Sequence, residues 1–439
     1  MIKLTVVAAT ALLALSASAR ADTLKQQIAA DLPGLMAIYR DLHQNPELSF
    51  QEVRSAAIMA KAARAAGFEV TEKVGKTGVV AVLRNGPGPT VLIRADMDAL
   101  PVIEQTGLAY ASKVRGTSTA GVESGVMHAC GHDTHMTAWI AAARLLAGSK
   151  AQWSGTLVMI GQPAEEVNLG AKAMLDDGLF TQFPKPDYAL AFHDTGDLAG
   201  GVIGMRPGFA LANVDSVDIT VRGLGGHGAY PHTTKDPVVL ASAIVMRLQT
   251  LVSRESSPFD PAVVTVGSFH AGAKHNIISD EAKLQLTVRS YSDASRKLLL
   301  DGIRRITAGE AQTSGIPEKL MPTVAVLEPY ARATYNTPGF TAQLTDFFRA
   351  RFGADRVVQA EPVMAGEDFG EFARTEPDRI KSLIFWVGGR PAAELEAAKR
   401  EGRILPSLHS PFFAPEADKV IAAAAEALSS AAIELMPKR

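Results

Sequence analysis

After residue 22, segments with the residue spacing of helices alternate with short apolar runs typical of strands. Apolar residues recur at helical spacing over residues 24–42 and 51–66. Short apolar runs typical of buried strands occur at 79–84 (VVAVLR), 90–94 (TVLIR), 156–161 (TLVMIG) and 188–192 (YALAF). Because helical stretches separate these runs, the pattern indicates an α/β fold with a doubly wound, mainly parallel sheet.

The pattern changes near Ala212, where apolar and polar residues begin to alternate as they do in half-exposed strands. The segments that follow are predicted as strand, helix, strand, strand, helix and strand, at 214–223, 236–254, 262–269, 282–290, 293–309 and 323–327. That order is typical of a compact ferredoxin-like α+β module. A buried strand at 383–388 and a helix at 415–432 then resume the first pattern.

Chain length supports a division into domains, because 439 residues exceed what one hydrophobic core usually serves. We expect a first domain made of residues 22–211 and 326–439, interrupted by an inserted domain at 212–325. Residues 1–21 are predicted to be a cleavable signal peptide, since a lysine, an apolar run and the small-x-small sequence Ala-Arg-Ala follow one another. The run is too short to span a membrane, so we expect an exported, periplasmic or secreted protein without a membrane anchor.

The net charge and the cysteine content exclude some classes of ligand and one role for the thiol. With 44 basic and 46 acidic residues, the net charge of -2 gives no field that would attract nucleic acid or acidic lipid, so a small-molecule ligand is expected. Cys130 is the only cysteine, which excludes a disulfide within the chain. An inert buried thiol, an intermolecular bridge, a nucleophile and a metal ligand remain as its possible roles.

Polar side chains follow the predicted strands directly, at the sheet edge where α/β proteins place their sites. Asp96 and Asp98 follow 90–94, Glu165 and Glu166 follow 156–161, and His193 follows 188–192. Four carboxylates at one edge repel one another unless a cation holds them together. Because adjacent side chains point in different directions, we expect one of the two glutamates to bind metal and the other to act as a base.

The segment MHACGHDTHM (127–136) precedes a predicted helix and contains Cys130 and His132. A helix N-terminus is expected to lower the pKa of the thiol and favour the thiolate, which is the form that binds metal. Thiolate, imidazole and carboxylate ligands suit zinc, with manganese, cobalt or nickel as alternatives. His128 and His135 are expected either to bind metal or to orient its ligands by hydrogen bonds.

Together these residues resemble the metal-dependent aminoacylase and carboxypeptidase superfamily, in its branch of bacterial N-acyl-amino-acid amidohydrolases, hippurate hydrolases and plant indole-acetyl-amino-acid hydrolases. The resemblance covers nearly the whole chain after residue 40. Its motifs are DLHQNPELSFQE (41–52), RADMDALPV (94–102), MHACGHDTHM, GQPAEE (161–166), VRGLGGHGAYPH (221–232), MAGEDFGEFA (364–373) and LHSPFFAPEAD (408–418).

The resemblance implies a pair of divalent metal ions and a set of roles for the residues that match the family motifs. The implied metal ligands are Cys130, His132, Glu166, His193 and His409. Glu165 would be the general base. Asp98 would hold a ligand imidazole in its tautomer through its carboxylate. The implied reaction is hydrolysis of the amide bond of an N-acyl amino acid or a short peptide.

The resemblance also implies that the inserted domain forms a homodimer. His227 would then reach the active site of the second subunit and stabilise the oxyanion, while Asn276 would face the substrate. Arg289 is either a ligand for a substrate carboxylate or a surface arginine. The chain departs from the family at HDTGD (193–197), at NIIS (276–279) and at His275, which places substrate specificity in question.

Three other readings remain open at this point. An exported metal-binding or solute-binding protein without catalysis would need the ligands but not Glu165. A cysteine protease would use Cys130 as its nucleophile. A dipeptidase or carboxypeptidase of the same superfamily is a third possibility.

Overall fold

The computed structural model describes residues 2–438, with side chains from Thr23 onward. Helix α1 spans Ile2–Gln44 and therefore includes the segment predicted as a signal peptide. The side chains of that segment lie outside the described residues, so its cleavage stays a prediction. The chain divides into two compact units. Unit 1 comprises Met1–Gly208, Tyr335–Glu361 and Asp368–Arg439, and unit 2 comprises Phe209–Thr334 and Pro362–Glu367.

Unit 1 contains an eight-stranded sheet in the order β1-β2-β6-β3-β7-β18-β8-β17. Its strands are β1 (Glu69–Val74), β2 (Gly78–Asn85), β3 (Thr90–Asp96), β6 (Gly155–Gln162), β7 (Tyr188–Ala199), β8 (Ile203–Met205), β17 (Val357–Gln359) and β18 (Lys381–Arg390). The four central strands are parallel, whereas β1 and β2 run antiparallel to their neighbours. The predicted mainly parallel sheet is therefore confirmed at its centre.

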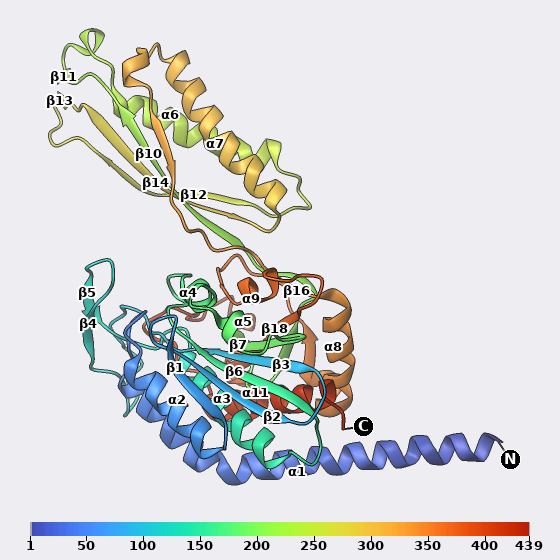
Figure 1. Ribbon diagram of the computed structural model, residues 1–439. Helices are drawn as coiled ribbons and strands as arrows, with labels where there is room; N and C mark the ends of the chain where they lie inside the picture. Colours follow the sequence, from blue (N-terminus) through green and yellow to red (C-terminus); the bar gives the residue numbers. More distant parts are fainter. Residues whose placement is uncertain (1, 439) are drawn as a thin grey trace. The chain divides into compact units, whose positions relative to one another are not determined.

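Several helices cover one face of this sheet (Figure 1). They are α1, α2 (Val53–Ala65), α3 (His132–Gly148), α8 (Pro338–Phe352) and α11 (Ala417–Leu435). The remaining helices of unit 1 are α4 (Gly170–Asp176), α5 (Leu179–Gln182), α9 (Gly370–Arg374) and α10 (Ala392–Glu401). A hairpin of β4 (Arg115–Thr117) and β5 (Glu123–Gly125) lies outside the main sheet.

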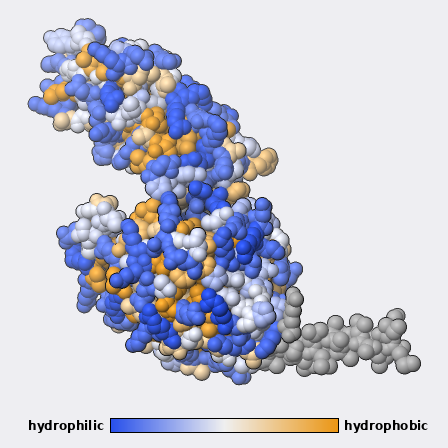
Figure 2. Space-filling model, viewed as in Figure 1, coloured by the Kyte–Doolittle hydropathy of each residue, from blue (hydrophilic) through white to orange (hydrophobic). Residues whose placement is uncertain are grey.

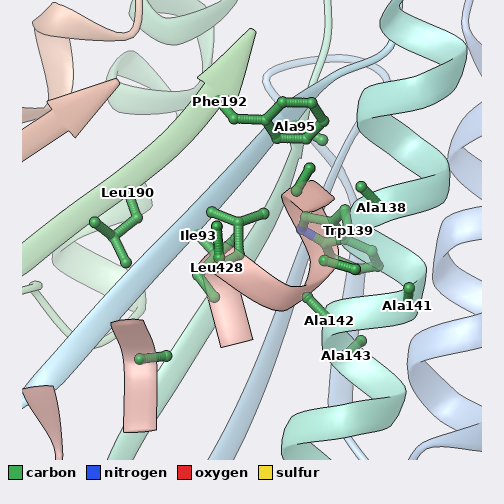
Figure 3. Packing of buried hydrophobic residues seen from close by; sticks show 14 of the residues in the cluster. Ile93, Ala95, Ala138, Trp139, Ala141, Ala142, Ala143, Leu190, Phe192 and Leu428 are labelled. Atoms are coloured by element: carbon green, nitrogen blue, oxygen red, sulfur yellow. The ribbon is translucent and has the colours of Figure 1, made fainter. Parts of the chain in front are cut away.

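Helix α3 is buried along nearly its whole length, and its small residues make this burial possible. Trp139 packs among alanines of the same helix, beside Ile93 of β3 and Leu428 of α11 (Figure 3). Alanine side chains let the helix approach the sheet closely while they cost no side-chain entropy. This packing holds the N-terminal end of α3, and with it the segment containing Cys130 and His132, at the edge of the sheet.

Unit 2 is a four-stranded antiparallel sheet with two helices, α6 (Pro237–Thr250) and α7 (Asp293–Thr313), packed on it (Figure 1). Its strands β10 (Asn213–Arg222), β12 (Val263–Ala271), β14 (Glu281–Ser290) and β15 (Thr323–Val326) lie in the order β12-β14-β10-β15. Their chain order and spatial order together are those of a ferredoxin-like module. Two short strands, β11 (Gly226–His227) and β13 (Ile277–Ile278), form a separate pair.

One segment of the described residues, Pro237–Glu255, is long and apolar enough to cross a membrane by length and composition. In this fold, Leu240, Ile244 and Leu248 of the segment are buried in the core of unit 2. Met246 on the same helix is 73% exposed, and Figure 2 shows an apolar patch on the surface of unit 2. The buried residues follow the spacing of a helix that packs one face against a sheet.

Candidate metal centre

The predicted metal ligands come from four separate segments of unit 1. Glu166 follows β6, His193 lies within β7, and His409 lies in the loop between α10 and α11. Cys130 and His132 lie at the start of α3. Since β6 and β7 belong to the parallel centre of the sheet, their carboxyl ends meet at one edge, where α/β folds place their sites.

All five side chains converge on one point. Cys130 Sγ lies 3.5 Å from His193 Nε2 and 3.3 Å from His409 Nε2. Glu166 Oε2 lies 3.4 Å from His409 Nε2, and its Oε1 lies 3.9 Å from His132 Nε2. The ligand atoms of Cys130, His132 and His193 form one group within 4.8 Å, and those of Cys130, Glu166 and His409 form another. Cys130 belongs to both groups.

The two buried imidazoles present lone pairs to this point. His132 Nδ1 lies 2.8 Å from the carbonyl oxygen of Asp98, and His193 Nδ1 lies 2.7 Å from that of Asp194. A carbonyl can only accept, so each Nδ1 carries the proton and each Nε2 is free to bind a metal. His132 Nε2 and Glu166 Oε1 are buried without a hydrogen-bond partner among the described residues. Buried polar atoms of this kind normally have a partner, and a cation would supply one.

The electrostatics of the centre also favour a cation. Burial, followed by the charges of Glu166 and Glu165, raises the pKa of the Cys130 thiol well above its usual range. Burial raises the pKa of Glu166 to about 8. The expected lowering of the thiol pKa by the start of α3 was therefore wrong, because burial and two carboxylates outweigh the helix end. A divalent cation reverses this balance and favours the thiolate.

Asp98 contacts the predicted ligand His132 more closely through its main-chain carbonyl than through its carboxylate. Its main-chain carbonyl holds His132, whereas its carboxylate oxygen is 3.5 Å from the same Nδ1. The carboxylate instead accepts the backbone N–H groups of Glu165 and Glu166, each at 3.0 Å, and the hydroxyl of Ser49 at 2.6 Å. Asp98 therefore supports a predicted metal ligand and the turn that carries the predicted base at the same time.

His135 connects two carboxylate residues behind the centre. Its Nδ1 donates to Asp96 Oδ1 at 2.6 Å, and its Nε2 accepts the backbone N–H of Asp194 at 3.0 Å. Arg94, which is only 1% exposed, donates to the other oxygen of Asp96 at 2.6 Å. Sequence reasoning missed Arg94, although a charged residue inside the apolar run TVLIR was the available signal. His135 thus has an orienting role in this structure.

A second buried histidine network lies outside the metal centre, and the sequence did not indicate it. His43 Nδ1 lies 2.6 Å from Asp133 Oδ2, and its Nε2 lies 3.1 Å from Glu104 Oε1. Burial opposes protonation, but these two carboxylates raise the pKa of His43 to about 10. By contrast, burial lowers the pKa of His128 to about 4, and neither ring nitrogen of His128 has a hydrogen-bond partner among the described residues.

Two site residues adopt backbone conformations that non-glycine residues rarely use. Ala164, next to Glu165, has φ 49°, and His409 has φ 66°. The backbone N–H of His409 donates to Ala129 at 2.8 Å, which ties the late loop to the segment containing Cys130. Gly131 has φ 77°, and a Cβ there would lie 2.1 Å from Asp194 Oδ2. Such strain persists only where the surrounding contacts impose it, and it concentrates at functional sites.

The remaining predicted residues belong to unit 2. His227 and Asn276 lie side by side, because β11 pairs with β13 and the N–H of Gly228 donates to the Asn276 carbonyl at 2.9 Å. Both are exposed, as is His275. Arg289 lies at the other end of β14, where its Nε donates to Thr287 Oγ1 at 2.9 Å. Unit 2 therefore brings together the predicted histidine and asparagine but not the arginine.

Known proteins resemble the chain over nearly all its length. Residues 92–431 match peptidase family M20/M25/M40. The hippurate hydrolase of Campylobacter jejuni is 39% identical over 76% of this chain and 84% of its own length. Thermostable carboxypeptidase 2 of Saccharolobus solfataricus is 34% identical over 93% of this chain and 97% of its own.

Among solved structures, the YXEP protein of Bacillus subtilis, described as a dinuclear metal binding peptidase, has a TM-score of 0.75. It is 30% identical and covers 93% of this chain and 99% of its own. Sequence and fold therefore agree with the arrangement of side chains at the sheet edge, and the chain belongs to peptidase family M20/M25/M40.

Proposed function

We propose that the protein is a metal-dependent amidohydrolase that cleaves the amide bond of N-acyl amino acids or short peptides. The observation that carries this proposal is the convergence of one thiol, three imidazoles and one carboxylate on a single point, with Glu165 beside them. Family membership and the names of the two relatives, a hippurate hydrolase and a carboxypeptidase, support linear amides as the substrate class.

The proposed metal site consists of side chains that suit a pair of divalent ions, zinc or else manganese, cobalt or nickel. The residues that would hold them are Cys130, His132, Glu166, His193 and His409. When bound, the ions would polarise the scissile carbonyl and acidify the attacking water. Cys130 is the residue that the group with His132 and His193 shares with the group with Glu166 and His409.

Glu165 is the proposed general base. Its backbone N–H is held by Asp98, and its Oε2 lies 3.8 Å from His132 Nε2. From this position the carboxylate would take a proton from the attacking water and return it to the leaving amine. Glu166 also approaches His132 Nε2, at 3.9 Å, but its other oxygen lies 3.4 Å from His409 Nε2. This second contact with a proposed ligand supports Glu166 as the metal-binding member of the pair.

The proposed oxyanion donor is His227 from a second copy of the chain, brought by a homodimer that the inserted unit forms. The backbone N–H of Ala229 donates to His227 Nδ1 at 3.0 Å. Nδ1 is therefore an acceptor, and Nε2 carries the proton. An exposed N–H donor of this kind suits the charge that develops on a carbonyl oxygen during amide hydrolysis. Asn276 beside it is the proposed substrate contact, with Arg289 as a candidate for a substrate carboxylate.

Mixing two inactive variants tests this arrangement. H227A lacks the donor and E165Q lacks the base, so each homodimer should be slow. A mixed dimer has one complete site if His227 acts across the dimer, and free exchange should recover about a quarter of the wild-type sites. No recovery in a dimer shown to exchange subunits, or a monomer by analytical ultracentrifugation, would contradict the proposal.

Export to the periplasm or outside the cell is also part of the proposal. It is supported by the sequence of residues 1–21, with cleavage before Asp22. Mass spectrometry of the protein from an exporting host should find Asp22 as the first residue. A protein that keeps Met1 in the soluble fraction would contradict it.

The function itself is tested by incubating the metal-loaded protein with N-acetyl and N-benzoyl amino acids and with dipeptides. We expect release of free amino acid from at least one substrate, loss of activity with a chelator, and recovery after metal addition. Activity that survives chelation but not thiol alkylation would instead favour a cysteine nucleophile. Metal binding without turnover on any substrate would favour a binding protein.

A further inference from the structure

The turn that follows β6 carries both glutamates of the proposed site, and its first residue is strained. Ala164 is fully buried and has φ 49°. Its carbonyl accepts the N–H of Leu169 at 3.2 Å and that of Gly170 at 3.1 Å, which closes the turn. A Cβ on Gly170 would lie 1.5 Å from the Pro163 carbonyl oxygen. The chain has little room to rearrange here, so the direction of the glutamate side chains depends on how Ala164 is held.

Three successive backbone N–H groups of this turn point at carboxylates. Those of Glu165 and Glu166 donate to Asp98, and that of Ala164 donates to Glu52 Oε1 at 2.8 Å. Successive N–H groups that point the same way form a concave site for negative charge. The carboxylates of Asp98 and Glu52 occupy this concave site, and Glu52 accepts the N–H of the strained residue, Ala164.

Glu52 is 0% exposed and uses both carboxylate oxygens. Oε1 also accepts the N–H of Phe50 at 2.8 Å, and Oε2 accepts the hydroxyl of Thr77 at 2.5 Å. Phe50 has φ 63°, so the same oxygen binds the N–H groups of two non-glycine residues in the left-handed region. That region is unfavourable for a residue with a Cβ, and hydrogen bonds to a carboxylate are among those strong enough to offset the cost.

We propose that Glu52 is a positioning residue for the proposed reaction: it holds Ala164 in its left-handed conformation and thereby directs Glu165 and Glu166 to their separate places. It acts through the backbone of the turn and touches neither the substrate nor a proposed metal ligand side chain. This inference rests on the roles proposed above for Glu165 and Glu166.

Glu47 provides a matched control within the same sequence motif. Its two oxygens accept the N–H groups of Arg54 at 2.9 Å and Ser55 at 2.8 Å, at the start of helix α2. Glu47 and Glu52 are therefore both glutamates that accept two backbone N–H groups. Only Glu52 contacts the turn after β6. Loss of either should lower the melting temperature, but only loss of Glu52 should change the site.

The test compares E52A, E52Q and E47A, each loaded with the same metal. Removing a residue that supports a metal ligand typically costs ~10–100-fold in metal affinity or activity. For E52A we expect a loss of this size both in kcat and in metal affinity, while KM stays nearly unchanged. Metal affinity is measured by competition with a chelator. E52Q should stay within about fivefold of wild type, because its amide oxygen still accepts from Ala164 and its NH₂ group can donate to Thr77. E47A should keep wild-type kcat and metal affinity.

A second variant keeps the proposal testable if E52A folds poorly. Glycine adopts φ 49° without strain. The double variant E52A/A164G should therefore bind metal at least about threefold more tightly than E52A alone. Wild-type metal affinity and kcat in folded E52A, equal losses in E47A, or no recovery with A164G would each overturn the proposal. Metal affinity also separates the two hypotheses: if no substrate is ever cleaved, the proposed function fails, while the effect of Glu52 on Glu166 is still measured.

Discussion

Cys130 and His409 are separated by 279 positions in the chain, yet the Sγ of one lies 3.3 Å from the Nε2 of the other. The backbone of His409 is tied to the same segment through Ala129. The first and last proposed ligands along the chain are therefore neighbours, and the site is complete only when both ends of unit 1 are folded together.

Cys130→Ser should weaken metal binding. A serine hydroxyl is a much poorer ligand than a thiolate for zinc or a similar ion, and Cys130 is the residue shared by both groups of ligand atoms. We expect at least one equivalent of metal to be lost after dialysis, measured by elemental analysis, with a parallel loss of turnover. Unchanged metal content and rate would show that Cys130 is an inert buried thiol.

Glu165→Gln should separate metal binding from turnover. The amide cannot take a proton, so kcat should fall by ~10²–10⁴-fold, the usual contribution of general acid–base catalysis. Metal content should persist, because the other five residues remain. Glu376→Gln, which removes exposed ion pairs with Lys185 and Arg379, is the control and should leave kcat unchanged. Full activity in the Glu165 variant would reject the proposed base.

Asp98→Asn should impair the site although the Asp98 carbonyl still holds His132. One carboxylate oxygen becomes an NH₂ group, which cannot accept the N–H of Glu165 or of Glu166. We expect a ~10–100-fold loss in kcat and in metal affinity. Ser49→Ala removes only the hydroxyl that donates to Asp98 and should cost far less. Equal effects of the two substitutions would mean that the carboxylate does not organise the turn.

His43→Gln should destabilise the protein in a pH-dependent way. The pKa of His43 is raised from 6.5 to about 10 in the folded state. The stability that its protonation contributes is therefore fully present below about pH 6.5 and is lost as the pH rises through about 10. The difference in unfolding free energy between wild type and variant, from urea titrations at pH 6, 8 and 10, should shrink as the pH rises.

His232→Gln, at an exposed histidine, is the control for this pH series and should change the unfolding free energy far less than His43→Gln does at pH 6. A difference for His43→Gln that stays constant or grows toward pH 10 would show that the imidazole is neutral in the folded protein.

Local pattern in the sequence was sufficient to predict much of the fold. Apolar runs such as 90–94 and 188–192 became central strands, because a strand buried on both faces must be apolar throughout. Strand β7 nevertheless continues to Ala199 through the polar segment HDTGD. Its backbone pairs with β18 over this segment, although the side chains there do not follow the apolar pattern of a buried strand.

The sequence by itself determined which residue types could form the site, since a strand that ends at a sheet edge presents whatever polar residues follow it. Only the tertiary structure decided how each one is used. Asp98 serves through its carbonyl as well as its carboxylate, His135 joins Asp96 to Asp194, and Glu52 holds a strained turn. These roles depend on hydrogen bonds between segments far apart in the chain, and such contacts have no local periodicity from which they could be predicted.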